Sequence, residues 1–433
     1  MGFARQHIDE CVREHEGCKH LSTPPPLLPT RLVDCTDPAH PRLVFTSRKR
    51  GEYLALSYVW GADQFHKAMK STVLLYVEGF DSRILPRTIH DAIFVTHALK
   101  FQYLWVDALC ITQDDGIDRQ HEIGHMHHIY RHATLTIFAA CTASASDGFI
   151  YEGELPDPWD LSWSALSLSL PFICPPSSTS AGFRDGSPVS QLQLGYIHLR
   201  PPSRIDLEYH RSLGVMATRA WCMQEYLLSP RALIFTADRL LLFKCRTNIR
   251  GVGNSVHCFD DTEPRLPDVL FLRDPPAAEP GSKEWIDTRI AWLEVVRDYS
   301  GRSATLESDK LVACAAVAQR FARVLGCDYL AGFWRSDTLL NDLLWKSLAD
   351  MPPRRRVPRP PPAYLAPSWS WAAAQAVTYR AVTYGFRTNI HETKGLRPEY
   401  IALAEIIPNR CEVTLKDPSL LFGEVTGGTL VLR

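Results

Sequence analysis

The sequence predicts an α/β fold, with a small, mostly parallel sheet between flanking helices. Two observations predict it. Over residues 50–148, short apolar segments alternate with amphipathic segments of helical period, in the order strand, helix, strand, helix, strand. The strand-like segments are apolar on both faces, which is typical of parallel strands that helices cover on either side. We expect a long insert to interrupt this core, and a helical and then β-rich C-terminal region to follow it.

The first half of the core contains two predicted strands and a helix. Residues 53–60 are apolar and aromatic, and predict a buried strand that ends at Gly61. Residues 72–77 are β-branched and aromatic, and predict a further strand. Residues 85–100 predict a helix, because Pro86 stands where a helix N-terminus tolerates proline and apolar residues follow at helical spacing.

The second half repeats the alternation. Residues 103–111 form an apolar run that is interrupted by one carboxylate, Asp107, and predict a buried strand. Residues 118–133 predict a helix with Asp118 as its N-cap, and residues 134–141 predict another strand. Further along, residues 219–228 predict a helix, and two strands are expected around the turn at Ala237 and Asp238.

Composition divides the chain into three parts. Residues 1–50 are expected to form an N-terminal extension. Residues 51–245 are expected to form the main domain, with its α/β core at 51–148, a Ser-, Pro- and Gly-rich insert at 150–215, and a closing helix and strands at 216–245. Residues 246–433 are expected to form a C-terminal region, with helices at 283–299, 306–325 and 337–348 and then strands.

Charge and cysteine content exclude several classes of function. The 433 residues include 47 basic and 48 acidic side chains, so no overall attraction to nucleic acid or to an anionic membrane follows. The N-terminus lacks the apolar segment of a signal peptide, and no apolar run reaches the about 18 residues of a membrane span. The 12 cysteines are scattered, unlike those of a disulfide scaffold. We therefore expect a cytoplasmic protein without nucleic-acid or membrane partners.

No metal site is expected from the sequence. Cys11, His15, Cys18 and His20 have ligand chemistry, but their spacing lacks the paired short intervals that are typical of a closed zinc site. The alternative is a short amphipathic helix whose cysteines are buried as small apolar residues.

Candidate site residues follow from where the predicted strands end. In an open α/β sheet, ligands bind beyond the carboxyl ends of the parallel strands. The first strand delivers Ser57, Trp60 and Gly61 to this edge, and the second delivers Asp107, Cys110, Gln113 and Asp114. We expect Ser57, Trp60, Gly61, Gln113 and Asp114 to contact a ligand there.

Three residues are candidates for catalysis, each with a structural alternative. A buried Asp107 needs a partner or a raised pKa, so it is a candidate general acid or base, or else it caps the next helix. Cys110 is a candidate nucleophile if a neighbouring base lowers its pKa, or else it is a core residue. Glu225, on the helix at 219–228, is a candidate catalytic carboxylate, or else it bonds to the sheet or to Arg219 or Arg231. Trp60 could stack on a flat ligand or pack in the core.

An ordered set of sequence blocks resembles the fungal heterokaryon-incompatibility (HET) domain family. The blocks are LSYVWG (56–61), LPRTIHDAI (85–93), YLWVDALCITQDD (103–115), MHHIYRHATLTIFAA (126–140), DGF (147–149) and RAWCMQEYLLSPRALIF (219–235). Blocks at 329–334, 343–345 and 366–372 resemble the region that follows this domain in the family. Two positions depart from the family pattern, Thr112 where asparagine is frequent and Cys222 where threonine is more frequent.

The resemblance implies a role in fungal non-self recognition, as an effector of programmed cell death that a protein partner or self-association switches on. HET domains have been proposed to be distantly similar to TIR domains, which share a flavodoxin-like layout, and some TIR domains cleave NAD with a glutamate. This implies a second hypothesis, a nucleotide-cleaving hydrolase that requires no cofactor and has NAD as a substrate, with a cysteine-dependent enzyme as its variant. The third hypothesis is a non-catalytic interaction scaffold, so the sequence leaves open whether the chain is an enzyme.

Overall fold

The central feature of the fold is a nine-stranded sheet of order β11-β10-β9-β8-β5-β3-β4-β1-β2. The computed structural model describes residues 1–19, 24–61, 66–150, 168–174, 193–199, 209–237, 240–252, 256–257, 265–304, 306–347, 364–374, 377–378, 406–418 and 420–433. These residues form two compact units, one of Met1–Phe149 with Tyr209–Arg433 and one of Ile150–Glu208. The sheet belongs to the first unit.

The middle of the sheet is parallel. Its strands are β3 (Leu54–Ser57), β4 (Tyr103–Trp105), β5 (Leu135–Phe138) and β8 (Arg231–Phe235). β3 pairs in parallel with both β4 and β5, and β5 pairs in parallel with β8. In chain order the strands therefore lie second, first, third, fourth across the sheet, which is the flavodoxin-like arrangement with its switch point between β3 and β5. The expected mostly parallel sheet with flanking helices is confirmed.

Antiparallel strands extend both edges. β1 (Arg31–Asp34) pairs with β4, and β2 (Arg42–Phe45) pairs with β1. On the other side, β9 (Leu241–Cys245), β10 (Ile249–Gly251) and β11 (Val256–His257) continue from β8. The expected N-terminal extension therefore supplies two strands of the central sheet as well as helices α1 (Gly2–Glu14) and α2 (Glu16–Lys19).

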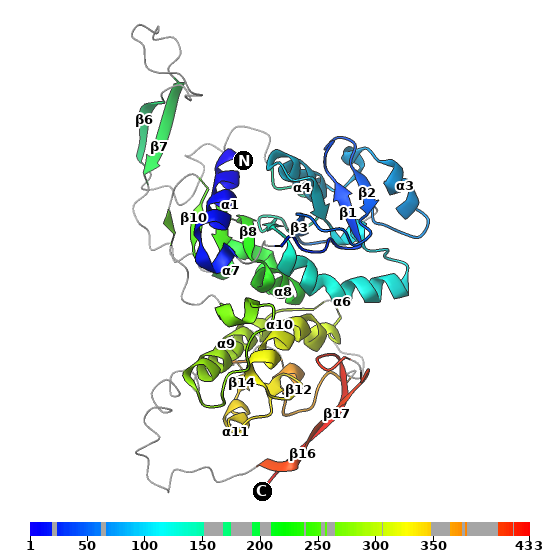
Figure 1. The fold of residues 1–433 in the computed structure, drawn as a ribbon, viewed down its shortest axis with the longest axis vertical. Helices are drawn as coiled ribbons and strands as arrows, with labels where there is room; N and C mark the ends of the chain where they lie inside the picture. The colour runs from blue at the N-terminus through cyan, green and yellow to red at the C-terminus, as the bar shows by residue number, and fades with distance from the viewer. Residues whose placement is uncertain are drawn as a thin grey trace. The chain divides into compact units, whose positions relative to one another are not determined.

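Helices cover the parallel strands on both faces. Figure 1 shows α4 (Arg87–Ala98) on one side of β3, and α6 (Gly116–His132) with α8 (Ala220–Leu228) on the other. The strands are buried along their length, with Leu54, Leu56, Leu135 and Ile137 all at 0% exposure. This explains the apolar runs, because a strand between two helical layers has no face in water. A short helix, α5 (Asp107–Cys110), follows β4 directly.

The C-terminal region packs against α8 through α10 (Asp309–Leu325), which lies beside α9 (Lys283–Ser300). Its core forms around Gly332, whose carbonyl accepts from the indole N–H groups of Trp292 (3.1 Å) and Trp371 (2.9 Å). Gly332 has φ +107°, and a Cβ there would lie 2.3 Å from Trp371 Nε1, so glycine is required. The region also contains β12 (Tyr329–Leu330), β13 (Phe333–Trp334), α11 (Leu339–Asp342), β14 (Lys346–Ser347), β15 (Val377–Thr378), β16 (Ile406–Leu415) and β17 (Val425–Leu432). Helix α7 (Tyr209–Leu213) precedes α8.

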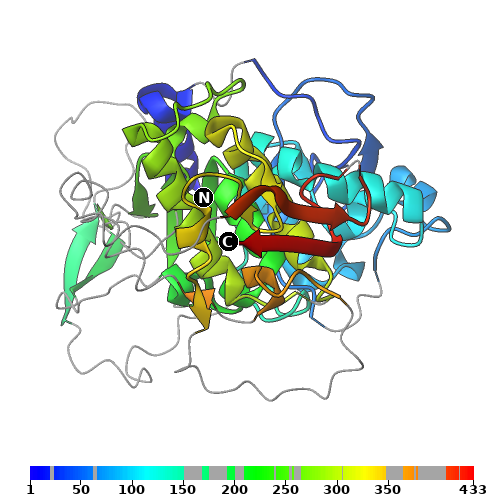
Figure 2. The ribbon, with the colours of Figure 1, turned by 90° about the horizontal axis from the view of Figure 1, so that it is seen from below.

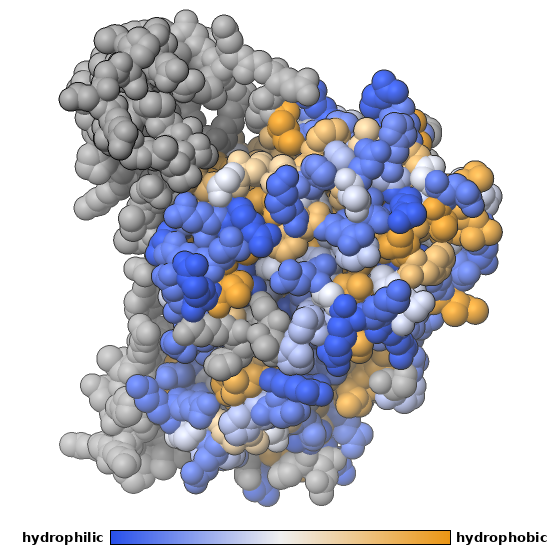
Figure 3. All heavy atoms as spheres, turned by 45° about the horizontal axis from the view of Figure 1, so that its top comes forward, coloured by the Kyte–Doolittle hydropathy of each residue, from blue (hydrophilic) through white to orange (hydrophobic). Residues whose placement is uncertain are grey.

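Strands β16 and β17 form an antiparallel pair that closes the chain, drawn in red in Figure 2. It is joined to β12 and β13 by the Tyr329–Phe422 ring contact and by Arg335, which donates to Cys411 O at 2.6 Å. In the second unit, β6 (Leu168–Cys174) and β7 (Gln193–Leu199) form an antiparallel pair. Hydrophilic and hydrophobic residues are interspersed on the face that Figure 3 shows.

Four local predictions are wrong. Of the strand expected at residues 103–111 only β4 forms, and residues 107–110 are the helix α5, because Cys110 N and Ile111 N bond to the carbonyls four residues earlier. Residues 72–77 form a helix, α3 (Val73–Glu78), because only Tyr76 of this segment is buried and no neighbouring strand pairs with it. The N-cap of α6 is Asp115, whose carboxylate accepts from Ile117 N and Asp118 N, whereas Asp118 bonds to Arg31. The helix expected at 337–348 is limited to α11, after which the chain turns into β14. Among the described residues, no helix has the length and apolar character that crossing a membrane requires.

Arg31 connects the added edge of the sheet to the segment that carries the candidate residues. Its Nε donates to Cys110 O at 2.7 Å, and its Nη2 donates to both carboxylate oxygens of Asp118, at 2.7 and 2.6 Å. Asp118 also accepts from Thr112 N at 2.8 Å. The guanidinium is therefore a buried crosslink between β1, the end of α5 and α6.

Replacing Arg31 with methionine is expected to lower the free energy of unfolding by about 3–5 kcal/mol, because it leaves a partly buried carboxylate without its partner. The measurement is urea denaturation followed by circular dichroism. Arg83→Met is the matched control, since Arg83 also pairs with an aspartate, Asp81, but on the open surface. Equal, small effects of the two substitutions would contradict the assigned role of Arg31.

Candidate functional site

The polar side chains of the sheet gather where the parallel strands end. β3 ends at Ser57 and leads through Tyr58 to Trp60, and β4 ends at Trp105, two residues before Asp107. These strands are neighbours and run in the same direction, so their carboxyl ends meet at one edge. Helix α8 passes the same edge and contributes Glu225.

Glu225 is bonded to the end of β3. Ser57 Oγ donates a short hydrogen bond to Glu225 Oε2, and both side chains are buried, at 0% and 7% exposure. Of the alternatives that the sequence left open, the geometry selects the bond to the sheet. Arg231 bonds elsewhere, to the cysteine cluster described below and to Thr134 O.

The environment of Glu225 favours its neutral form. The pKa of Glu225 is raised from 4.5 to about 7, chiefly by burial and in part by the charge of Asp107, against the lowering effect of the Ser57 hydrogen bond and of Arg219. Tyr130, whose hydroxyl donates to Leu56 O at 2.9 Å, also lies beside Glu225. Near neutral pH this carboxyl can therefore either give or take a proton.

Asp107 stands at the first turn of α5 with several donors around it. Trp60 Nε1 donates to its Oδ2 at 2.6 Å, Ala108 N donates to its Oδ1 at 2.6 Å, and Tyr58 also hydrogen-bonds to it. Burial nevertheless raises the pKa of Asp107, against the lowering effect of these hydrogen bonds and of Arg219. Asp107 thus holds the first turn of α5 through Ala108 N, as its structural alternative predicted. Its pKa is also shifted, as is typical of catalytic carboxyl groups.

The site reaches the surface on one side. Trp60, Asp107 and Arg219 are half-buried and Gly61 is exposed, whereas Ser57 and Glu225 lie behind them. A ligand would therefore meet the Trp60 indole and the Asp107 carboxylate first. A separate shallow depression beside α8 and β9, lined by Tyr226, Lys244, Arg246 and Phe271 among others, includes neither carboxylate in its lining.

Three of the expected ligand-contacting residues have clear structural roles. Gly61 has φ +77°, and a Cβ there would lie 2.8 Å from the Ser144 side chain, so the turn after β3 requires glycine. Gln113 Nε2 donates to Asp107 O at 3.1 Å and to Ile111 O at 3.0 Å, which holds the loop after α5. Asp114 is exposed and accepts from Lys70 N at 2.8 Å. Gln113 therefore fixes the backbone at Asp107, while Asp114 bonds to the loop that contains Lys70.

Cys110 does not have the environment of a nucleophile. Its thiol is 0% exposed, and burial raises its pKa to about 12, so the reactive thiolate is disfavoured. Its sulfur accepts from Val106 N at 3.5 Å. Three histidines of α4 and α6, which have the chemistry of a base, contact other groups: His97 contacts Cys35 O, His90 contacts Asp91 and His121 contacts Glu122. Cys110 is a core residue, which was the structural alternative.

Residues 53–225 match the profile of the family Heterokaryon incompatibility protein (HET). The chain contains a heterokaryon-incompatibility domain. The match begins at the residue before β3 and ends at Glu225, so it includes both carboxylates and every candidate residue of the site. No curated protein and no solved structure shows significant similarity to the chain.

Two residues of the HET site were not anticipated from the sequence. Tyr58 bonds to Asp107 and Tyr130 lies beside Glu225, and both fall within the motif blocks at 56–61 and 126–140. Their aromatic character indicates core packing, and sequence alone does not show that their hydroxyls point toward the carboxylates. The geometry therefore describes a pair of partly desolvated carboxyl groups, each held by hydroxyl or indole donors, at the carboxyl ends of β3 and β4 in the HET-domain sheet.

The raised pKa of Glu225 predicts how Glu225→Gln changes stability with pH. Below pH 4.5 Glu225 is protonated in both the folded and unfolded states. The free energies of unfolding of the wild type and of Glu225→Gln therefore differ by a constant amount there. Between 4.5 and about 7 only the unfolded state ionises, which destabilises the wild type but not the variant. As the pH rises from about 5 to about 8, the free energy of unfolding of the variant should therefore increase by about 3 kcal/mol relative to that of the wild type.

The measurement is urea denaturation of both proteins at the two pH values. Glu52→Gln serves as the matched control, because Glu52 is exposed and water solvates it in either state. A stability difference for Glu225→Gln that is the same at both pH values would contradict the assigned environment of Glu225.

Proposed function

We propose that this chain is an effector of programmed cell death in fungal non-self recognition. The HET domain supports this proposal, since the family is associated with the death of fused cells that differ genetically. A protein partner or self-association would switch the effector on. The near-zero net charge supports recognition by local shape and chemistry instead of by a general electrostatic field.

We propose further that the effector is a hydrolase that cleaves a nucleotide, with NAD as the first substrate to test. The observation that carries this proposal is the pair of partly desolvated carboxyl groups, Asp107 and Glu225, at the carboxyl ends of β4 and β3, the edge where open α/β sheets bind ligands. The half-buried indole of Trp60 beside Asp107 supports a flat ligand, because an aromatic ring stacks on a base or a nicotinamide.

The proposed reaction breaks the bond between the nicotinamide nitrogen and the ribose. Nicotinamide leaves with the bonding electron pair, and the ribose carbon becomes positively charged in the transition state. Asp107, whose anion accepts from Trp60 and Ala108, stabilises that charge. A water molecule attacks the carbon, and Glu225 accepts the proton that the water loses, which a pKa of about 7 allows. The products are nicotinamide, ADP-ribose and a proton, so no oxidant or cofactor is required.

The test is expression of the full chain in yeast, with wild type compared with Glu225→Gln, Asp107→Asn and Cys110→Ser. We expect the wild type to reduce viability and cellular NAD together. Glu225→Gln and Asp107→Asn should each restore both, with activity reduced about 100-fold or more, because each removes a group that exchanges a proton or stabilises charge. Cys110→Ser should remain toxic, since the thiol lies in the core.

Folded protein levels are measured in parallel, by limited proteolysis of the soluble fraction, so that loss of fold is not mistaken for loss of chemistry. Toxicity at constant NAD would overturn NAD as the substrate. Loss of activity in Cys110→Ser alone would move catalysis to the cysteine. Full toxicity of both carboxylate variants at normal folded levels would support the interaction scaffold and overturn the hydrolase.

A further inference from the structure

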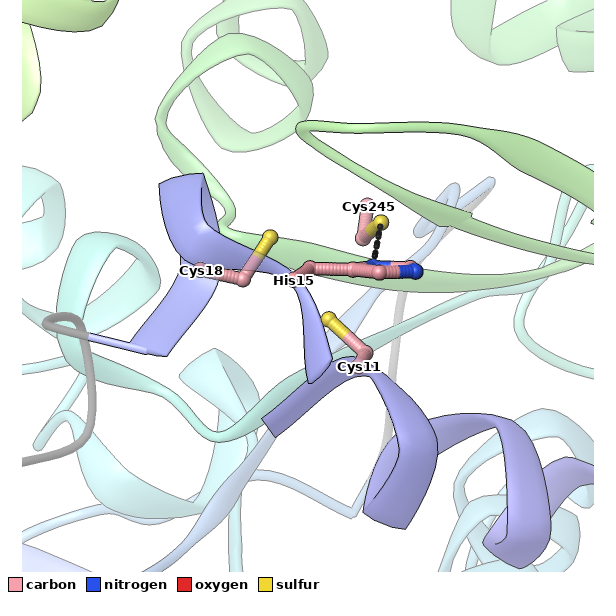
Figure 4. A group of neighbouring side chains, drawn as sticks. All are labelled: Cys11, His15, Cys18 and Cys245. Atoms are coloured by element: carbon pink, nitrogen blue, oxygen red, sulfur yellow. Dashed lines mark hydrogen bonds between the residues drawn. The ribbon is translucent and has the colours of Figure 1, made fainter. Parts of the chain in front are cut away.

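A compact cluster of metal-binding side chains lies away from the carboxylate site. It consists of Cys11, His15, Cys18 and Cys245, each with one ligand atom, and these atoms all lie within 4.8 Å of one another. Figure 4 shows the three sulfur atoms and the His15 ring pointing toward a common centre. Cys11, Cys18 and Cys245 are buried, at 0%, 0% and 2% exposure.

The spacing of the ligand atoms is close to that of a tetrahedral zinc site. With Zn–S bonds of about 2.3 Å and Zn–N bonds of about 2.0 Å, neighbouring ligand atoms in a tetrahedron are about 3.5–3.8 Å apart. His15 Nδ1 and Cys245 Sγ are already 3.3 Å apart, and the widest separation in the cluster is 4.8 Å. Movements of less than about 1 Å, within the reach of side-chain rotation, would complete the tetrahedron.

The backbone brings residues from both ends of the HET region together. Helix α1 ends at Glu14, and the residue that follows it, His15, has an extended conformation (φ −83°, ψ 110°). The chain then turns, so that Cys18 N donates to His15 O at 2.9 Å. This break places Cys11, His15 and Cys18 around one point. The fourth member, Cys245, is the last residue of β9 and lies 230 positions from His15.

Hydrogen-bond donors surround the sulfur atoms. Arg231 Nε donates to Cys11 Sγ at 3.2 Å, and Thr247 N donates to Cys245 Sγ at 3.4 Å. When the Asn248 amide is oriented so that its oxygen accepts from Arg250, its nitrogen takes the place 3.4 Å from Cys245 Sγ and becomes a third donor. Donors of this kind stabilise thiolates, which are the form of cysteine that binds a metal.

The charge of the surroundings fits a metal with three thiolates. Zn²⁺ with three cysteine thiolates and a neutral histidine carries a net charge of −1. The Arg231 guanidinium, 1% exposed and directly opposite Cys245 in the β8–β9 ladder, balances that charge. A buried ionic group of this kind is tolerated when an opposite charge and hydrogen bonds accompany it.

We propose that Cys11, His15, Cys18 and Cys245 form a structural zinc site. All four positions of the tetrahedron are protein ligands, which is typical of structural and not of catalytic zinc. Soft sulfur ligands in tetrahedral geometry favour zinc over the harder divalent cations. The sequence did not predict the site, because a local search finds only three of its ligands, and His20, which the sequence offered as the fourth, lies outside the described residues.

The site joins the N-terminal helices α1 and α2 to strand β9 of the sheet. Two other contacts lie on the same junction, the Glu10–Arg250 ion pair at 2.8 Å and the ring contact between His7 and Phe243. Zinc would also hold β8 through Arg231, and β8 follows the helix that carries Glu225. Metal binding would therefore stabilise the sheet at β8 and β9.

The test is the metal content of the full chain, expressed without a metal-affinity tag, purified with a reducing agent and dialysed exhaustively. Mass spectrometry of the metal should find about one zinc per chain in the wild type. Cys245→Ser should retain less than about a tenth of that amount, because a site with three ligands holds zinc far less tightly. Cys314→Ser is the matched control, since Cys314 is equally buried but lies in α10, and it should keep its zinc.

Two further measurements keep the proposal testable if Cys245→Ser fails to fold. Wild-type protein with Co²⁺ in place of zinc should show the intense visible absorption of tetrahedral cobalt and a thiolate charge-transfer band. His15→Cys should retain about one zinc, because four cysteines also form a closed site. Zinc-free wild type that binds neither Zn²⁺ nor Co²⁺, or a disulfide among Cys11, Cys18 and Cys245 in protein isolated under reducing conditions, would overturn the proposal.

Discussion

The arrangement of the HET domain depends on burying Glu225 at the end of β3. The hydrogen bond from Ser57 joins two residues that are 168 positions apart, and the whole insert lies between them in sequence. Burial of a carboxyl group is costly unless the group is hydrogen-bonded or protonated, and here both apply. The same burial that fixes α8 against the sheet raises the pKa of Glu225 to about 7. The structural constraint and the proposed chemistry therefore have one origin.

The carboxylates are held from two sides. Arg31, from strand β1 between β4 and β2, bonds to Cys110 O and to Asp118 and so fixes the segment that begins with Asp107. On the other side of β3 in the sheet, Arg231 connects β8 to Cys11 and to Cys18 O of the N-terminal helices. Both arginines thus join residues that precede the family match to helices or strands within or just after it. The first 50 residues are therefore part of how the HET sheet is built, and not an appendage to it.

Much of the fold could be predicted, because strands buried between helices leave continuous apolar runs and covering helices leave a helical period. The site edge was predictable for the same reason, since parallel strands end together and Ser57, Trp60 and Asp107 follow two of them. Other features depend on contacts that local sequence does not encode. Residues 73–78 have strand-forming side chains but find no strand to pair with, and Cys245 meets His15 only after the sheet has formed. The hydroxyl orientations of Tyr58 and Tyr130 are likewise set by packing.

In the proposed chemistry, Glu225 exchanges its proton near neutral pH while it remains bonded to Ser57. Infrared difference spectra between the wild type and Glu225→Gln, recorded on folded protein over a pH series, measure this directly through the carbonyl band of the protonated carboxyl group. We expect a band that is absent from the variant and that disappears in the wild type with a midpoint at about pH 7. A midpoint near 4.5, the ordinary value for glutamate, would contradict it.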